Sequence, residues 1–112
     1  MCDEKAGEGA LLATVHEAVE TGQVKLSLHA LGEAVADGIT RSDILEALAD
    51  AHVLEDYPDW WLGPCCLLYG VTWGGRDLHI VVSYDGLPVT IITTYEPRPP
   101  TWATPTRRGG AA

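Results

Sequence analysis

The stretch RDLHIVVSYDGLPVTIITTYEP, residues 76–97, has the pattern of a β-hairpin. Two apolar runs flank Asp85-Gly86, a dipeptide that is a strong signal for a tight β-hairpin turn. A second turn signal, Gly74-Gly75, joins this hairpin to an earlier apolar run. The sequence therefore predicts an antiparallel meander of three consecutive strands, over 65–73, 76–84 and 88–95.

Helical periodicity dominates the region before the meander. Apolar residues form one stripe between residues 10 and 20, and the pattern ends at Thr21-Gly22. A short alternating strand over 23–28 leads into a helix from about residue 29 to residue 36. A further helix starts at Thr40, whose spacing to Asp43 is that of a capping box, and a strand follows over 53–57.

This order of elements predicts an α+β fold, in which N-terminal helices pack on one face of an antiparallel sheet of about four strands. A chain of 112 residues is long enough for one core and too short for two. We place a single domain at residues 10–97. Residues 1–9 form an N-terminal tail, and residues 98–112 form a Pro-rich C-terminal tail that lies over the surface or is disordered.

The charge is uneven along the chain. The net charge is −9, and residues 1–59 hold 13 acidic and 3 basic residues. A protein that grips a nucleic-acid backbone needs clustered Lys and Arg, so this composition disfavours RNA or the ribosome as a partner. No apolar run approaches the roughly 20 residues that span a bilayer, and the N-terminus lacks a secretory pattern, so we expect a cytoplasmic protein without membrane contact.

Cysteine usage agrees with that compartment. The chain has three cysteines, and two of them, Cys65 and Cys66, are adjacent in a predicted strand. An odd number with an adjacent pair is a poor disulfide framework. We expect these two residues to be buried as small hydrophobic side chains, with a vicinal disulfide or redox switch as the alternative.

Several residues of the meander are of types that take part in catalysis. RNA cleavage by the ribose 2′-hydroxyl needs a base, an acid and a positive group near the phosphate. His29 or His79 could act as base or acid, Arg76 could bind the phosphate, and Tyr95 could orient the substrate. We favour a structural alternative, in which Arg76 forms a pair across the sheet, His79 lies near the core and Tyr95 closes the last strand. Arg76 and His79 are three residues apart, so they should face opposite sides of the sheet.

Two other kinds of site are open. His29, Glu33 and Asp37 lie at helical spacing and could share a divalent cation, although we expect no metal or other cofactor because a dense His/Cys cluster is absent from the sequence. Trp60 and Trp61 in a loop, and Trp102 in the tail, form the candidate partner-binding set. The loop pair could also cap the core, and Trp102 could dock on this molecule instead of on a partner.

A set of short motifs resembles a known family. Ser27-Leu28-His29-Ala30, Arg76-Asp77-Leu78-His79 and Thr93-Thr94-Tyr95-Glu96-Pro97 occur in this order. Over residues 24–102 the chain resembles a bacterial and archaeal family of small domains of unknown function, which is placed near the BrnT and RelE toxins. The resemblance implies a toxin-like fold and a ribonuclease ancestry with an antitoxin as partner.

The candidate active face departs from that family. Where the family usually has a histidine followed by two arginines at helical spacing, this chain has His29, Glu33 and Asp37. Carboxylates repel a phosphate. We therefore expect a non-catalytic or degenerate relative of these toxins that acts through protein–protein interaction. The alternatives are an active toxin-type endoribonuclease that cleaves mRNA and a small metal-binding domain.

Overall fold

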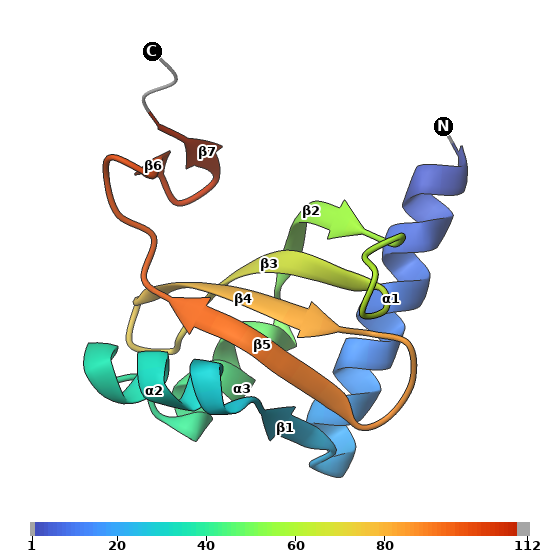
Figure 1. The fold of residues 1–112 in the computed structure, drawn as a ribbon, viewed down its shortest axis with the longest axis horizontal. Helices are drawn as coiled ribbons and strands as arrows, with labels where there is room; N and C mark the ends of the chain where they lie inside the picture. The colour runs from blue at the N-terminus through green and yellow to red at the C-terminus, as the bar shows by residue number, and fades with distance from the viewer. Residues whose placement is uncertain (1, 110–112) are drawn as a thin grey trace.

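The predicted meander forms the centre of the molecule. The computed structural model describes residues 2–109 (Figure 1). Strands β3 (Cys65–Val71), β4 (Asp77–Ser83) and β5 (Val89–Tyr95) pair antiparallel in this order, as predicted. β2 (His52–Tyr57) pairs antiparallel with β3.

The main sheet has five strands, where we predicted about four. The additional member is β1 (Val24–Leu26), which pairs parallel with β5, so that the strand order is β1-β5-β4-β3-β2. The alternating pattern of residues 23–28 predicts a strand, but the partner of that strand lies more than 60 residues away along the chain. The fold is thus α+β with a mostly antiparallel sheet.

Three helices in the described part of the chain pack with the sheet: α1 (Cys2–Thr21), α2 (Leu28–Asp37) and α3 (Arg41–Ala49). Residues 2–9, which we assigned to a tail, continue the helix that was predicted from residue 10. The capping box at the start of α3 is present, with reciprocal bonds between Thr40 and Asp43. None of the helices in the described part of the chain is long and apolar enough to cross a bilayer.

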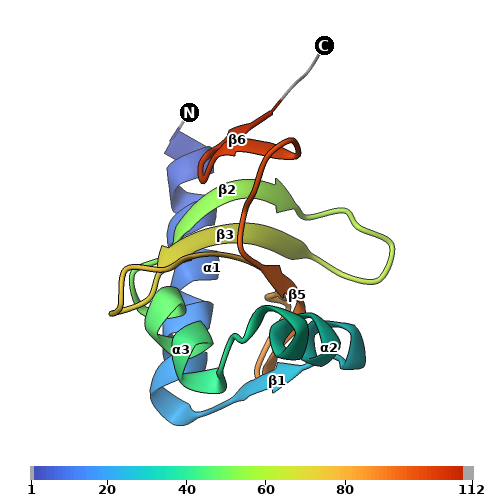
Figure 2. The ribbon, with the colours of Figure 1, turned by 90° about the vertical axis from the view of Figure 1, so that its left-hand side faces the viewer.

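The core lies between the sheet and the helices. Helix residues such as Val15, Ile44 and Leu48 pack against strand residues such as Leu68 and Ile80, and all five are fully buried. Figure 2 shows α2 and α3 on one side of the sheet. Apolar burial of this kind contributes roughly 25 cal/mol per Å² and is the main stabilising force of the domain.

The opposite face of the sheet is partly covered by the C-terminal segment. Residues after β5 cross to a small hairpin made of β6 (Trp102–Thr104) and β7 (Arg107–Arg108) (Figures 1 and 2). Of the two alternatives for the tail, the described residues 98–109 adopt the one in which it lies over the surface. Residues 110–112 lie outside the described part.

The adjacent cysteines lie on opposite faces of β3. Cys66 belongs to the core under the helices, whereas Cys65 faces the other side, and both are buried free thiols, as predicted. Burial raises the pKa of Cys66 to about 12. The thiol is therefore kept protonated and unreactive near neutral pH.

A close contact between α3 and β3 gives the first prediction. A Cβ atom added at Gly70 would lie 2.1 Å from the Ala47 carbonyl oxygen, so Gly70→Ala would push α3 off the sheet. We expect this variant to lower the free energy of unfolding by about 3 kcal/mol, measured by urea denaturation. Gly32 is a suitable control, because a Cβ there meets nothing within 4 Å. Gly32→Ala should be neutral or raise stability by up to about 1 kcal/mol, and equal losses in both variants would contradict the account.

Candidate functional site

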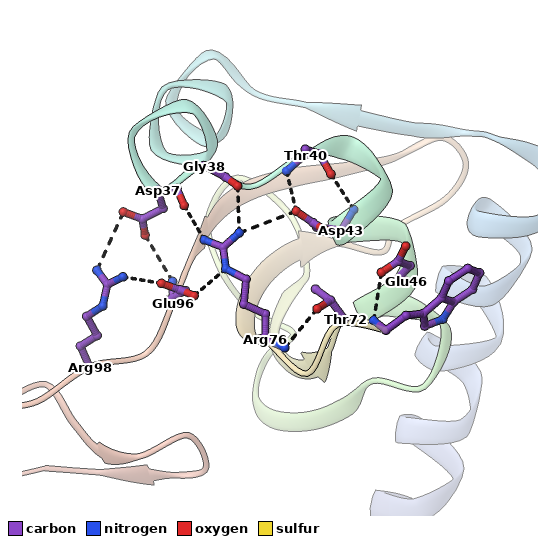
Figure 3. Close-up of polar contacts among 10 residues, drawn as sticks. Asp37, Gly38, Thr40, Asp43, Glu46, Thr72, Arg76, Glu96 and Arg98 are labelled. Atoms are coloured by element: carbon purple, nitrogen blue, oxygen red, sulfur yellow. Dashed lines mark hydrogen bonds and ion pairs between the residues drawn. The ribbon is translucent and has the colours of Figure 1, made fainter.

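Arg76 is the centre of a polar network between the sheet and the helices (Figure 3). Its Nε donates to Glu96 Oε2 at 2.6 Å, and Nη1 donates to the Gly38 carbonyl oxygen at 2.8 Å. Nη2 donates to the Asp37 carbonyl oxygen, and Asp43 Oδ2 lies 3.7 Å from Nη1. The two carbonyls belong to the C-terminal end of α2, where a cation is favourable because the last carbonyls of a helix carry partial negative charge.

This network leaves Arg76 poorly suited to bind a phosphate. Most of its N–H groups already have acceptors, and the carboxylates of Glu96 and Asp43 lie beside it. The charge-assisted bond from Arg76 lowers the pKa of Glu96, so that the carboxylate stays ionised and would repel an anion. The pair that Arg76 makes with Glu96, just after β5, agrees with the cross-sheet pair of the structural alternative, whereas its bonds to the end of α2 were not predicted.

Glu33 and Asp37 have a structural role at the edge of β5. β1 accompanies β5 only as far as Ile91, so the outer side of β5 has no strand partner beyond that residue. The Thr94 amide donates to Glu33 Oε1 at 3.1 Å, and the Glu96 amide donates to Asp37 Oδ2 at 3.4 Å. Arginines in these two positions could not do this, since a guanidinium has no hydrogen-bond acceptor.

Among the described residues, His29 contacts Glu33 but makes no bond to β5 itself. Its side chain is 70% exposed on α2, and Nε2 lies 3.3 Å from Glu33 Oε1. Asp37 is turned toward the Glu96 amide and lies 3.9 Å from Arg98 Nη1. Among the side chains that the structure describes, from residue 9 to residue 109, no group of three or more His, Cys, Asp or Glu is placed to share an ion. The predicted metal set thus provides one pair without a third ligand in the described part of the chain.

His79 and Tyr95 lie together on the other face of the sheet. His79 Nε2 is 2.5 Å from the Pro105 carbonyl oxygen, and Nδ1 is 3.2 Å from the Tyr95 hydroxyl oxygen. A neutral ring satisfies both partners, with Nε2–H donating to the carbonyl and Nδ1 accepting from the hydroxyl. Burial lowers the pKa of His79 and raises the pKa of Tyr95, so both side chains are held uncharged.

Trp102 packs over His79 and covers this cluster. Its ring centroid is 4.3 Å from that of His79, in an edge-to-face arrangement, and its side chain is almost fully buried. The Arg108 guanidinium stacks 4.7 Å from the Trp102 ring centroid and makes two bonds of 2.8 Å to the Glu55 carboxylate. Trp102 therefore docks on this molecule, which is one of the two alternatives that the sequence left open.

The four catalytic candidates do not form one site. Arg76 lies on the helix side of the sheet, while His79 and Tyr95 lie under the C-terminal hairpin on the other side. His29 projects from α2 into solvent. Within residues 2–109, the only contact among these four side chains is the one between His79 and Tyr95. An acid, a base and a phosphate ligand are thus not brought together.

One of the two loop tryptophans borders an apolar hollow on the sheet face that the helices leave uncovered. Trp60 lines a hollow of about 300 Å³ together with Tyr57, Cys65, Val81 and Ile92. Trp61 is 81% exposed, and its ring centroid is 6.3 Å from that of Trp60. Trp60 therefore contributes to the surface of the sheet, and Trp61 projects from it.

The largest departure from expectation is the outward side of α2. Leu28, Leu31 and Val35 are 88%, 50% and 74% exposed, and they lie on one stripe of the helix. Sequence reasoning missed them because an apolar stripe is normally assigned to the core. The sequence does carry a sign of this exposure, because α2 has apolar residues on two sides and only one side can be buried. The buried side is the one with Ala30 and Ala34.

The buried histidine predicts a pH-dependent stability. The groups around His79 are Tyr69, Tyr95, Trp102, Glu55, Arg108 and Asp77. Because its folded-state pKa is below the ordinary 6.5, the unfolded chain takes up this proton first as the pH falls. The free energy of unfolding should therefore fall below about pH 6.5, by at most about 1.4 kcal/mol per pH unit for one proton.

Urea denaturation between about pH 7.5 and about pH 5.5 measures this slope. His79→Gln should flatten it, because the residue that titrates differently in the two states is removed. His52→Gln replaces an exposed histidine at the start of β2 and should leave the slope unchanged. A slope that His79→Gln does not alter would contradict the assignment.

Comparison with known proteins agrees with the motif resemblance at the family level. The model of the family described as Domain of unknown function (DUF4258) matches residues 26–96, a range that holds α2, α3, the meander and the Arg76 network. No curated protein and no solved structure matches the chain. The matched range covers more than half of the sequence, and the chain therefore belongs to the DUF4258 family.

Proposed function

We propose that this chain is a non-catalytic protein-interaction module, a degenerate relative of the RelE/BrnT-type ribonuclease toxins. The observation that carries the proposal is the orientation of α2. A surface helix of a globular protein normally turns its charged side chains toward solvent and its apolar side chains toward the core. In α2 the carboxylates of Glu33 and Asp37 turn toward β5, and aliphatic side chains face outward.

An outward aliphatic stripe is costly unless something covers it. Leu28 and Val35 are mostly exposed and would each gain up to about 1.5–3 kcal/mol on full burial, whereas Leu31 is half buried already and would gain about half of that. Exposed apolar patches rimmed by polar residues are typical of protein-binding surfaces. The stripe therefore supports a partner protein that docks on α2.

The alternative, an active endoribonuclease, has less support. The candidate acid and base residues lie on different sides of the sheet, and Arg76 is engaged with acceptors of its own fold. The net charge of −9 opposes binding to an RNA backbone. The apolar hollow beside Trp60 instead favours a second protein contact on the opposite face of the sheet.

The proposal predicts that α2 contacts a protein in the cell. A photo-crosslinking amino acid in place of Leu31 should yield a defined adduct with one partner protein, whereas the same group in place of Glu17, exposed on α1, should not. The combined change Leu28→Ser and Val35→Ser should weaken binding to the purified partner at least about tenfold. It should leave the free energy of unfolding within about 0.5 kcal/mol, because both side chains are exposed in the free protein.

Two results would contradict the proposal. One is that crosslinkers at positions 31 and 17 give the same set of adducts, or that neither position gives any adduct. The other is cleavage of cellular RNA by the purified chain, with or without ribosomes, that disappears in His29→Ala. That result would establish the enzymatic alternative instead.

A further inference from the structure

The outward face of α2 continues into an open hollow beside the edge strand β1. The hollow has a volume of about 450 Å³, and its apolar wall includes Leu31 and Val35 of α2 and Leu26 of β1. β1 is the last strand on this side of the five-stranded sheet (Figure 1). A side chain of a partner could therefore enter between α2 and the sheet edge without displacing any element of the fold.

Two cations line the same hollow. Lys25 of β1 and Arg41 at the start of α3 are both exposed, and neither lies within ion-pair distance of a carboxylate among the residues that the structure describes. Among the described residues, Arg107 in the C-terminal hairpin is the other cation without an ion pair. Arg76, Arg98 and Arg108 all pair with carboxylates of their own chain.

We propose that this hollow binds an acidic amphipathic segment of the partner protein. An aliphatic side chain of the segment fills the hollow against Leu31 and Val35, and flanking carboxylates pair with Lys25 and Arg41. The inference rests on the proposed function and specifies its partner. It follows from charge complementarity, since an apolar wall with two unpaired cations fits an apolar ligand that carries negative charge.

The net charge of the chain does not prevent this contact. Exposed charges are screened over about 8 Å at physiological ionic strength, so the charges at the contact itself decide which segment fits.

The test uses synthetic peptides of defined charge. A short amphipathic peptide with a leucine stripe flanked by glutamates is titrated into the isotope-labelled protein and followed by amide chemical shifts. A matched peptide has lysine in place of each glutamate. The acidic peptide should bind at least about tenfold more tightly, with shift changes confined to β1, α2 and the start of α3.

Charge reversal supplies the control variants. Lys25→Glu combined with Arg41→Glu should abolish the preference for the acidic peptide. Arg107→Glu reverses another exposed cation, one in the C-terminal hairpin that makes no ion pair among the described residues, and should leave the preference unchanged. The inference would be overturned if the basic peptide bound as tightly as the acidic one. It would also be overturned if Arg107→Glu abolished the preference for the acidic peptide to the same extent.

Two further outcomes separate this inference from the proposed function. The amide chemical shifts of α2 could change with protein concentration when no peptide is present. That result would show that a second copy occupies the hollow, and the inference would be wrong. Crosslinking from position 31 could capture a partner whose affinity is unchanged by the charge reversals at Lys25 and Arg41. In that case the inference fails and the proposed function stands. If no partner is captured from that position, the proposed function itself fails.

Discussion

The outer edge of β5 has no neighbouring strand beyond Ile91, and the packing of α2 on the sheet follows from this. β1 ends at Leu26, opposite Ile91, and the remaining amides of β5 on that side need other acceptors. Glu33 supplies an acceptor for Thr94, and Asp37 supplies one for Glu96, the residue directly after the strand. The spacings match, because four residues of a helix rise about 6 Å and two residues of a strand rise about 6.6 Å.

This constraint determines which way α2 faces. The side of the helix that carries the carboxylates must lie against β5, and Ser27 fixes the start of the helix by accepting from the Ala30 amide and donating to the Ile92 carbonyl. Arg76 holds the other end through the Asp37 and Gly38 carbonyls. Residues that look like an altered active face thus close a sheet edge, and the aliphatic stripe is left on the outside. The candidate interaction surface follows from the architecture.

Local signals in the sequence identified much of the fold. The Asp85-Gly86 turn predicted the meander, and the spacing of Thr40 and Asp43 predicted the start of α3. The parallel pairing of β1 with β5 could not be read in the same way, because the two strands are far apart in sequence and no turn links them. The packing of Trp102 on His79 was left open for a similar reason, since composition alone does not show what a Pro-rich tail contacts.

The candidate site was harder to predict than the fold. Arg76 and His79 were correctly expected to face opposite sides, because strand alternation is a local rule. The outward stripe of α2 was missed, because a helix with apolar residues on both sides does not show which side is buried. That choice depends on where its carboxylates find donors, which is a tertiary property.

Amide hydrogen exchange at Thr94 would show whether the Glu33 carboxylate closes the outer edge of β5. If Glu33 caps the edge of β5, this amide should be protected in the unmodified protein and in Glu33→Gln, whose side-chain oxygen can still accept the bond. It should exchange much faster in Glu33→Leu, which fills a similar volume without an acceptor. Rapid exchange in the unmodified protein, or equal protection in Glu33→Leu, would contradict the account.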